Sequence, residues 1–105
     1  MKKKFTVKKN HEFQNIINKG SLLKTNGYFI YYKKNNLTYH RFGISVGKKL
    51  GNAVIRNKIK RQIRSMLNID YSTSYGYDYI IIVRKNYFNN SYEDNKNILL
   101  NSIIK

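Results

Sequence analysis

The sequence contains no cysteine, no proline and no tryptophan, and only 5 of its 105 residues are Asp or Glu. Without cysteine, the chain has no disulfide framework, no thiolate zinc site and no thiol nucleophile. Its two histidines, His11 and His40, are too few to build a metal site from imidazoles. Disulfide-stapled scaffolds, zinc modules and cysteine hydrolases are therefore excluded.

Long hydrophobic runs are also lacking. The longest apolar run, Tyr79–Val83, has the length of a strand and falls far short of the roughly 18 residues of a membrane helix. The basic start at Lys2–Lys4 is not followed by the apolar stretch of a secretory signal. We therefore expect a cytoplasmic protein with no membrane association.

Positive charge is abundant: 21 Lys and Arg give a net charge of +16. Self-repulsion of this size does not stabilise a fold, so it points to a polyanionic partner.

The length predicts a single domain over residues 1–105. The hydrophobic content of 41% is too high for a disordered basic tail. Residues 1–9, which are basic and without clear period, are interpreted as a mobile arm.

The hydrophobic pattern predicts the order α-β-β-α-β-α, which is typical of an α+β sandwich. The first two predicted strands, Tyr28–Lys33 and Thr38–Val46, are predicted to pair as a hairpin around Asn35-Asn36. N-caps are predicted at Asn10, Asn52 and Ser91, and a helix stop at Gly20. The predicted ranges are Asn10–Lys19, Tyr28–Lys33, Thr38–Val46, Ala53–Leu67, Tyr79–Val83 and Ser91–Ile104.

The predicted helix at 53–67 has two unlike faces. Its apolar residues are Ile55, Ile59, Ile63, Met66 and Leu67, and its polar face carries Arg56, Asn57, Lys58, Lys60, Arg61 and Arg64. Like charges spaced four residues apart repel, and no acidic residue between positions 13 and 69 offsets them. Nucleic-acid phosphates would offset them and release counterions. The alternatives are a solvated basic face or a helix lying on an anionic membrane.

Two further features fit a nucleic acid. The loop before this helix places Lys48, Lys49 and Asn52 at a helix N-terminus, although its spacing does not match a nucleotide-binding phosphate loop. The strand face carrying Arg41, Gly43 and Ser45 has little bulk, so it either packs closely against another element or forms the floor of a cleft.

Aromatic and apolar side chains could line such a cleft. Phe13 and Ile17 on the first helix could form its wall, and Tyr28, Ile30 and Tyr32 share one face of the neighbouring strand. Aromatics beside cations suit stacking on unpaired bases, and core packing is the alternative.

No catalytic constellation is visible. The carboxylates Glu12, Asp70, Asp78, Glu93 and Asp94 are scattered over different predicted elements. Neither histidine has an obvious nucleophile or acid partner. We therefore predict no catalytic residue and no metal site on the protein, and a protein-only nuclease is a poor alternative.

The segment 41–64, RFGISVGKKLGNAVIRNKIKRQIR, closely resembles the signature of the bacterial ribonuclease P protein subunit. Residues 8–20 and 79–84 are similar to the family's first helix and late strand. The resemblance implies an α/β sandwich like domain 2 of ribosomal protein S5, with a left-handed crossover. An alternative interpretation is a ribosomal or general RNA-binding protein of similar fold. Such a protein would need the basic helix but no cleft for the leader of a precursor tRNA.

The resemblance also implies a function. Proteins of this family assist a catalytic RNA that holds Mg²⁺ and removes the 5′ leader of precursor tRNA, while the protein does no bond chemistry. The implied partners are the ribonuclease P RNA and the leader, and no protein partner is evident.

Carried over by position, the resemblance implies two sets of site residues. The implied RNA-binding residues are Lys48, Lys49, Asn52, Arg56, Asn57, Lys58, Lys60, Arg61 and Arg64, and the implied leader cleft contains Phe13, Ile17, Tyr32, Arg41 and Ser45. Three positions depart from the family: Lys58 and Thr6 replace arginines, and Ile17 replaces an aromatic residue.

Overall fold

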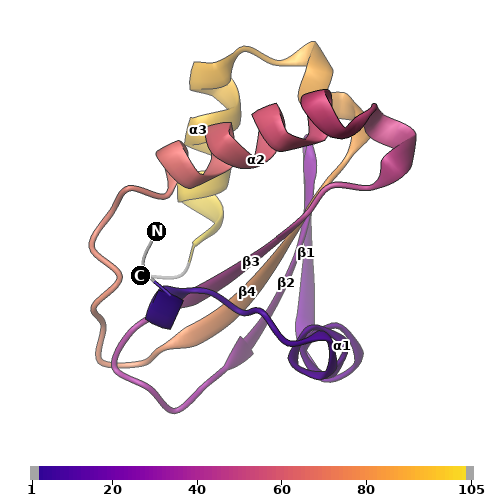
Figure 1. Ribbon diagram of the computed structural model, residues 1–105. Helices are drawn as coiled ribbons and strands as arrows, with labels where there is room; N and C mark the ends of the chain where they lie inside the picture. Colours follow the sequence, from indigo (N-terminus) through magenta and orange to yellow (C-terminus); the bar gives the residue numbers. More distant parts are fainter. Residues whose placement is uncertain (1–2, 104–105) are drawn as a thin grey trace.

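The computed structural model describes residues 3–103, which form a four-stranded sheet and three helices (Figure 1). This architecture confirms the predicted α+β class. The helices are α1 (Asn10–Lys19), α2 (Ala53–Met66) and α3 (Tyr92–Ser102), and the strands are β1 (Ser21–Thr25), β2 (Tyr28–Lys34), β3 (Arg41–Ser45) and β4 (Tyr77–Val83). Short 3-10 turns lie at η1 (Lys3–Phe5), η2 (Lys48–Leu50) and η3 (Lys85–Asn89).

The helix caps follow largely from local sequence. The Asn52 side chain accepts a hydrogen bond from the Ile55 amide at 3.0 Å, and Ser91 accepts one from the Asp94 amide at 3.1 Å. Both N-caps are as predicted. The cap of α1 differs, because Lys9 holds the N-cap position without a side-chain bond and Asn10 is already helical.

The sheet differs from the prediction in two ways. Strand β1 was not predicted, and it pairs with β2 through a turn at Gly27, whose φ of 103° favours glycine. The hairpin predicted between the segments that form β2 and β3 is wrong, because β4 lies between these two strands in the order β1-β2-β4-β3. Since Ile80 and Ile81 are both almost fully buried, on opposite faces, β4 takes a central position.

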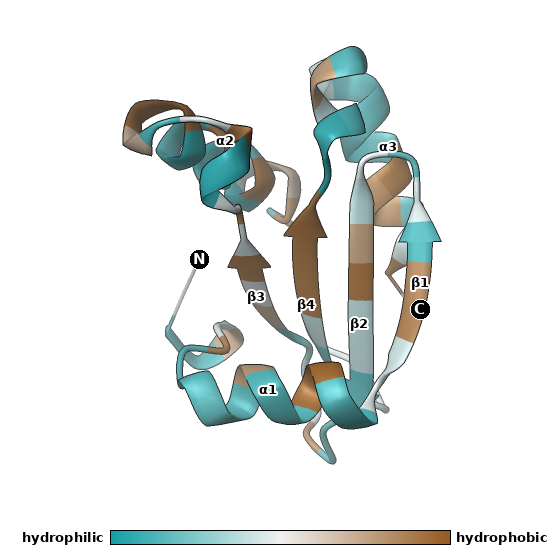
Figure 2. Cartoon of the chain, turned by 90° about the vertical axis from the view of Figure 1, so that its right-hand side faces the viewer, coloured by the Kyte–Doolittle hydropathy of each residue, from teal (hydrophilic) through white to brown (hydrophobic). Residues whose placement is uncertain are grey.

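The helices cover the two faces of the sheet unequally. Helices α2 and α3 pack on one face, where Phe42, Tyr79 and Ile63 belong to the main core. Helix α1 crosses only one end of the other face, over a smaller cluster that contains Ile16 and Ile80 (Figure 2). Strands β3 and β4 are parallel neighbours, and α2 connects them on the face away from α1, which is behind the sheet in Figure 2. This crossover connection is left-handed, as the resemblance implies.

The segment before α1 packs against the sheet where the structure describes it. The Val7 amide donates to the Phe42 carbonyl oxygen at 3.0 Å, and the Val7 side chain is 2% exposed. The Phe5 ring meets the Tyr71 ring edge-on, with centroids 4.6 Å apart. Residues 5–7 of the predicted arm therefore pack against the rest of the fold, while Met1 and Lys2 lie outside the described residues.

Candidate nucleic-acid interface

Helix α2 presents the predicted cationic face to solvent. Ile59, Ile63 and Met66 are buried against the sheet, whereas Ile55, predicted to be core, is 40% exposed near the start of the helix. Arg56 and Lys60 are half-buried, and Asn57, Lys58, Arg61 and Arg64 are exposed. Within residues 3–103 the ion pairs involve Arg41 alone, so no carboxylate neutralises this face.

Two of the predicted RNA-binding residues also hold the start of α2. The Arg56 side chain donates from Nε to the Gly51 carbonyl oxygen at 3.2 Å. The side-chain oxygen of Asn52 caps the helix, so only its side-chain NH₂ group remains to donate hydrogen bonds to a ligand. The turn η2, which carries Lys48 and Lys49, is thereby fixed beside the helix N-terminus.

A groove of about 590 Å³ runs between the segment before α1, the helix α1 itself, strand β3 and α2. We call it the cationic groove. Its lining includes the four cations Lys3, Lys8, Lys60 and Arg64, together with Phe13 and Gly43, and no carboxylate. It therefore joins the basic face of α2 to an aromatic side chain of α1.

Gly43 explains how Phe13 comes to lie over the sheet. A Cβ atom at Gly43 would lie 2.6 Å from Cζ of Phe13 and 2.9 Å from Cδ1 of Ile80. The low bulk of this strand face therefore serves close packing, and the same residue lines the floor of the cationic groove. The sequence analysis gave close packing and a cleft floor as alternatives for this strand face, and Gly43 shows both.

Replacing Gly43 with alanine is expected to lower the free energy of unfolding by about 1–3 kcal/mol, because the new methyl group overlaps the Phe13 ring. Denaturant unfolding measures this loss. Gly47→Ala is the matched control, because no atom lies within 4 Å of a Cβ built there. Equal stability of the two variants would contradict the close packing of Phe13 on β3.

A second groove, of about 790 Å³, lies where β3 and β4 end side by side. Ser45, Lys48 and Lys49 line it, as do Arg84, Lys85 and the 49%-exposed Phe88. The last three were missed by the sequence analysis. Because only the parallel pairing of β3 with β4 brings Arg84 near Ser45, no local pattern could have found them.

The predicted leader-cleft residues are not all brought together. Phe13 and Ile17 pack on the face covered by α1, with Tyr31 from β2. Tyr32 lies on the opposite face against the main core, with its ring 6.3 Å from that of Tyr79. Tyr32, predicted to line the same cleft as Phe13, therefore lies on the other face of the sheet, and Tyr31 occupies the face of Phe13.

Arg41 is not a free cation. Its Nε donates to Oδ1 of Asp78 at 2.8 Å and its Nη2 to Oδ2 at 2.6 Å, while Nη2 also reaches Oε2 of Glu12 at 3.4 Å. The hydrogen bonds to Asp78 are the main cause that raises the pKa of Arg41 above its usual value. Arg41, predicted as a leader-cleft residue, is thus engaged with two carboxylates in the structure.

Among residues 3–103, no three His, Asp or Glu side chains gather into a possible metal site. No helix in this range is long and apolar enough to cross a membrane.

The Ribonuclease P family matches residues 1–105. The chain belongs to this family. It is 48% identical over 107 residues to the ribonuclease P protein component of Mesoplasma florum, covering 100% of this chain and 97% of that one. It is 54% identical over 87 residues to that of Mycoplasma mycoides, covering 81% and 80%. The predicted resemblance is confirmed.

Solved structures agree. The Staphylococcus aureus RNase P protein superposes with a TM-score of 0.77 at 36% identity, covering 92% of this chain and 90% of that one. The Thermotoga maritima protein gives 0.78 at 27% identity, covering 91% and 92%. As a member of the Ribonuclease P family, this chain is a protein component of an endoribonuclease. Its family supports RNA binding, a role in tRNA processing and an RNA partner within a ribonucleoprotein.

Proposed function

We propose that the chain is the noncatalytic protein subunit of ribonuclease P, acting in the cytoplasm. Its α2 face and the η2 turn bind the catalytic RNA, and its cationic groove binds the 5′ leader of precursor tRNA. The observation that supports this best is the continuity of the α2 cations with a groove that holds Phe13 and lacks carboxylates.

Binding to RNA follows from charge. Each phosphate that meets an α2 cation releases condensed counterions, and the like charges along the helix then cease to repel one another. The leader adds unpaired bases, which stack on an aromatic face such as that of Phe13, while Lys60 and Arg64 face its phosphates from the same groove. Mature tRNA has no leader, so the groove favours the precursor.

We assign the bond chemistry and the Mg²⁺ ions to the partner RNA. Of the carboxylates, Glu12 and Asp78 are engaged with Arg41. Asp70 lies in the loop before β4, and Glu93 and Asp94 lie on α3, so they do not converge. Hydrolysis of a phosphodiester by metal-bound water needs ligands that hold the ion beside the reacting phosphate. The protein's part is to bind and to orient.

The direct test mixes the purified protein with a bacterial ribonuclease P RNA and precursor tRNA at low Mg²⁺, where the RNA alone is slow. We expect faster release of the 5′ leader with both components and none from the protein alone. Tight RNA binding without stimulation would favour a general or ribosomal RNA-binding role. Cleavage by the protein alone would overturn the noncatalytic assignment.

Replacing Arg61 with alanine is expected to weaken binding of the ribonuclease P RNA and to reduce the dependence of log K on log salt by about one phosphate contact. Arg61 is exposed on the cationic face of α2. Arg56→Ala is expected to act in the same direction. Binding titrations at several salt concentrations measure the slope, and Lys96→Ala on α3 removes the same charge elsewhere. An Arg61→Ala slope equal to that of the wild type would refute the phosphate contact.

A further inference from the structure

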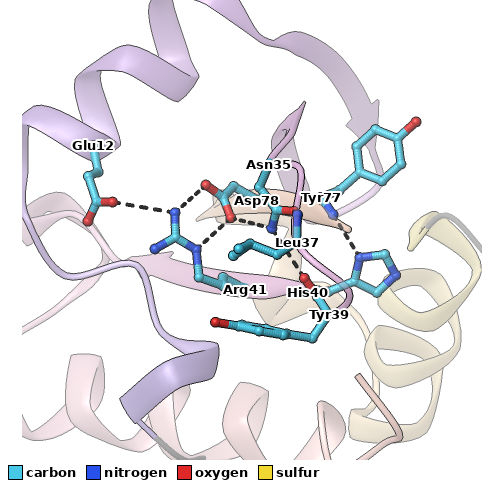
Figure 3. A network of polar contacts seen from close by, with 8 residues as sticks. All are labelled: Glu12, Asn35, Leu37, Tyr39, His40, Arg41, Tyr77 and Asp78. Atoms are coloured by element: carbon cyan, nitrogen blue, oxygen red, sulfur yellow. Dashed lines mark hydrogen bonds and ion pairs between the residues drawn. The ribbon is translucent and has the colours of Figure 1, made fainter. Parts of the chain in front are cut away.

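A network of polar contacts joins three elements at the end of the sheet that lies nearest α1 (Figure 3). Arg41 begins β3, and Asp78 lies directly across from it on β4. The two side chains form two hydrogen bonds, at 2.8 and 2.6 Å. Asn35, in the loop after β2, donates to Oδ1 of Asp78 at 2.9 Å. The guanidinium group is therefore held in a fixed orientation.

This fixed guanidinium group also reaches helix α1. Its Nη2 lies 3.4 Å from Oε2 of Glu12 (Figure 3). Glu12 directly precedes Phe13, and Arg41 lies two residues before Gly43 on the same strand face. The ion pair and the contact between Phe13 and Gly43 thus join the same turn of α1 to the same stretch of β3.

The exposure of the three charged groups argues for a role in positioning. The side chains of Asp78, Arg41 and Glu12 are 10%, 22% and 30% exposed. In a chain with net charge +16, a cation already shared by two carboxylates is a poor choice for a phosphate. Exposed cations such as Arg61 and Arg64 are better placed for that contact.

We propose that Arg41, oriented by Asp78, holds Glu12 and thereby sets the distance between α1 and β3, which fixes the width of the cationic groove and the place of Phe13. Arg41 and Glu12 are positioning residues that act through Phe13. This inference rests on the proposed function in one respect, namely that Phe13 contacts the leader.

The test uses Glu12→Gln, which removes the charge on α1 and leaves the bonds between Arg41 and Asp78 in place. Glu93→Gln is the matched control, because Glu93 also lies in the first turn of its helix and loses the same charge. We expect Glu12→Gln to lower the preference for precursor over mature tRNA by about two- to fivefold, as a partly exposed ion pair allows. We expect Glu93→Gln to leave it unchanged.

A second measurement does not depend on RNA. The NMR signals of Gly43 report the ring of Phe13 above it, so Glu12→Gln is expected to shift them and Glu93→Gln is not. In a Phe13→Ala background, Glu12→Gln is expected to cause no further loss of preference, because it acts through that ring. A full additional loss in that background would overturn the positioning role.

The two proposals fail in different ways. If Phe13→Ala leaves the preference for precursor tRNA unchanged, the leader groove is wrong, and the Gly43 signals alone decide the positioning role. If Phe13→Ala lowers the preference while Glu12→Gln changes neither the preference nor the Gly43 signals, the positioning role is wrong and the leader groove stands.

Discussion

Replacing Phe13 with alanine is expected to weaken binding of precursor tRNA by about 1–3 kcal/mol, which is roughly 5- to 150-fold, and to leave mature tRNA almost unaffected. Phe13 is half-buried, so its ring packs on Gly43 with one part and lines the cationic groove with another. A leader base that stacks there loses its platform in the alanine variant. The salt dependence stays the same, because no charge is removed.

Affinities of the assembled ribonucleoprotein for the two RNAs measure this effect. Phe13→Leu separates stacking from bulk, since leucine fills similar space without a flat ring, and it is expected to lose most of the preference as well. Tyr75→Ala is the control, because it removes an aromatic ring that is 66% exposed in the loop before β4. Equal losses for precursor and mature tRNA would rule out Phe13 as a leader contact.

Helix α2 could be predicted almost completely because its determinants are local. Asn52 caps the helix, the apolar residues Ile59 and Ile63 recur with helical spacing, and the cations fill the other face. The predicted end at Leu67 differs from the observed end at Met66 by one residue. Since all of these signals lie within one segment, no knowledge of the rest of the fold is needed.

The sheet could not be predicted in the same way because strand order depends on distant segments. The turn at Asn35-Asn36 suggested a hairpin, yet β4 enters between β2 and β3 from more than thirty residues further along. The side of Tyr32 follows from the register of that pairing, and a shift by one residue reverses the face. Alternation therefore grouped Tyr28, Ile30 and Tyr32 correctly but did not tell which helix they meet.

The role of Arg41 was hidden for the same reason. Its partner Asp78 is 37 residues away in the sequence, and only the parallel register of β3 and β4 places the two side chains opposite each other. In the sequence alone, an arginine on the same strand face as Gly43 is interpreted as a cation of the cleft. The carboxylate of Asp78, which only the fold brings close, changes that interpretation. The position of Glu12 on α1 then decides which helix the network holds.

The core beneath the interface can be tested with Phe42→Ala, which is expected to lower the free energy of unfolding by about 3–5 kcal/mol. Phe42 is fully buried on β3, and its ring stacks on Tyr79 with centroids 5.2 Å apart and packs at 5.0 Å from Tyr71. Removal of the ring leaves a cavity under the strand that carries Gly43.

Denaturant unfolding measures the loss, and Phe88→Ala is the matched control. Phe88 is 49% exposed, so its truncation is expected to change stability by about 0.5 kcal/mol or less. At temperatures where the Phe42→Ala protein remains folded, the salt dependence of RNA binding should match the wild type, because the α2 cations are unchanged. A Phe42→Ala loss as small as that of Phe88→Ala would mean that β3 does not pack on the α2 and α3 layer as described, and the close approach of Phe13 to Gly43 on its other face would then lose its rigid support.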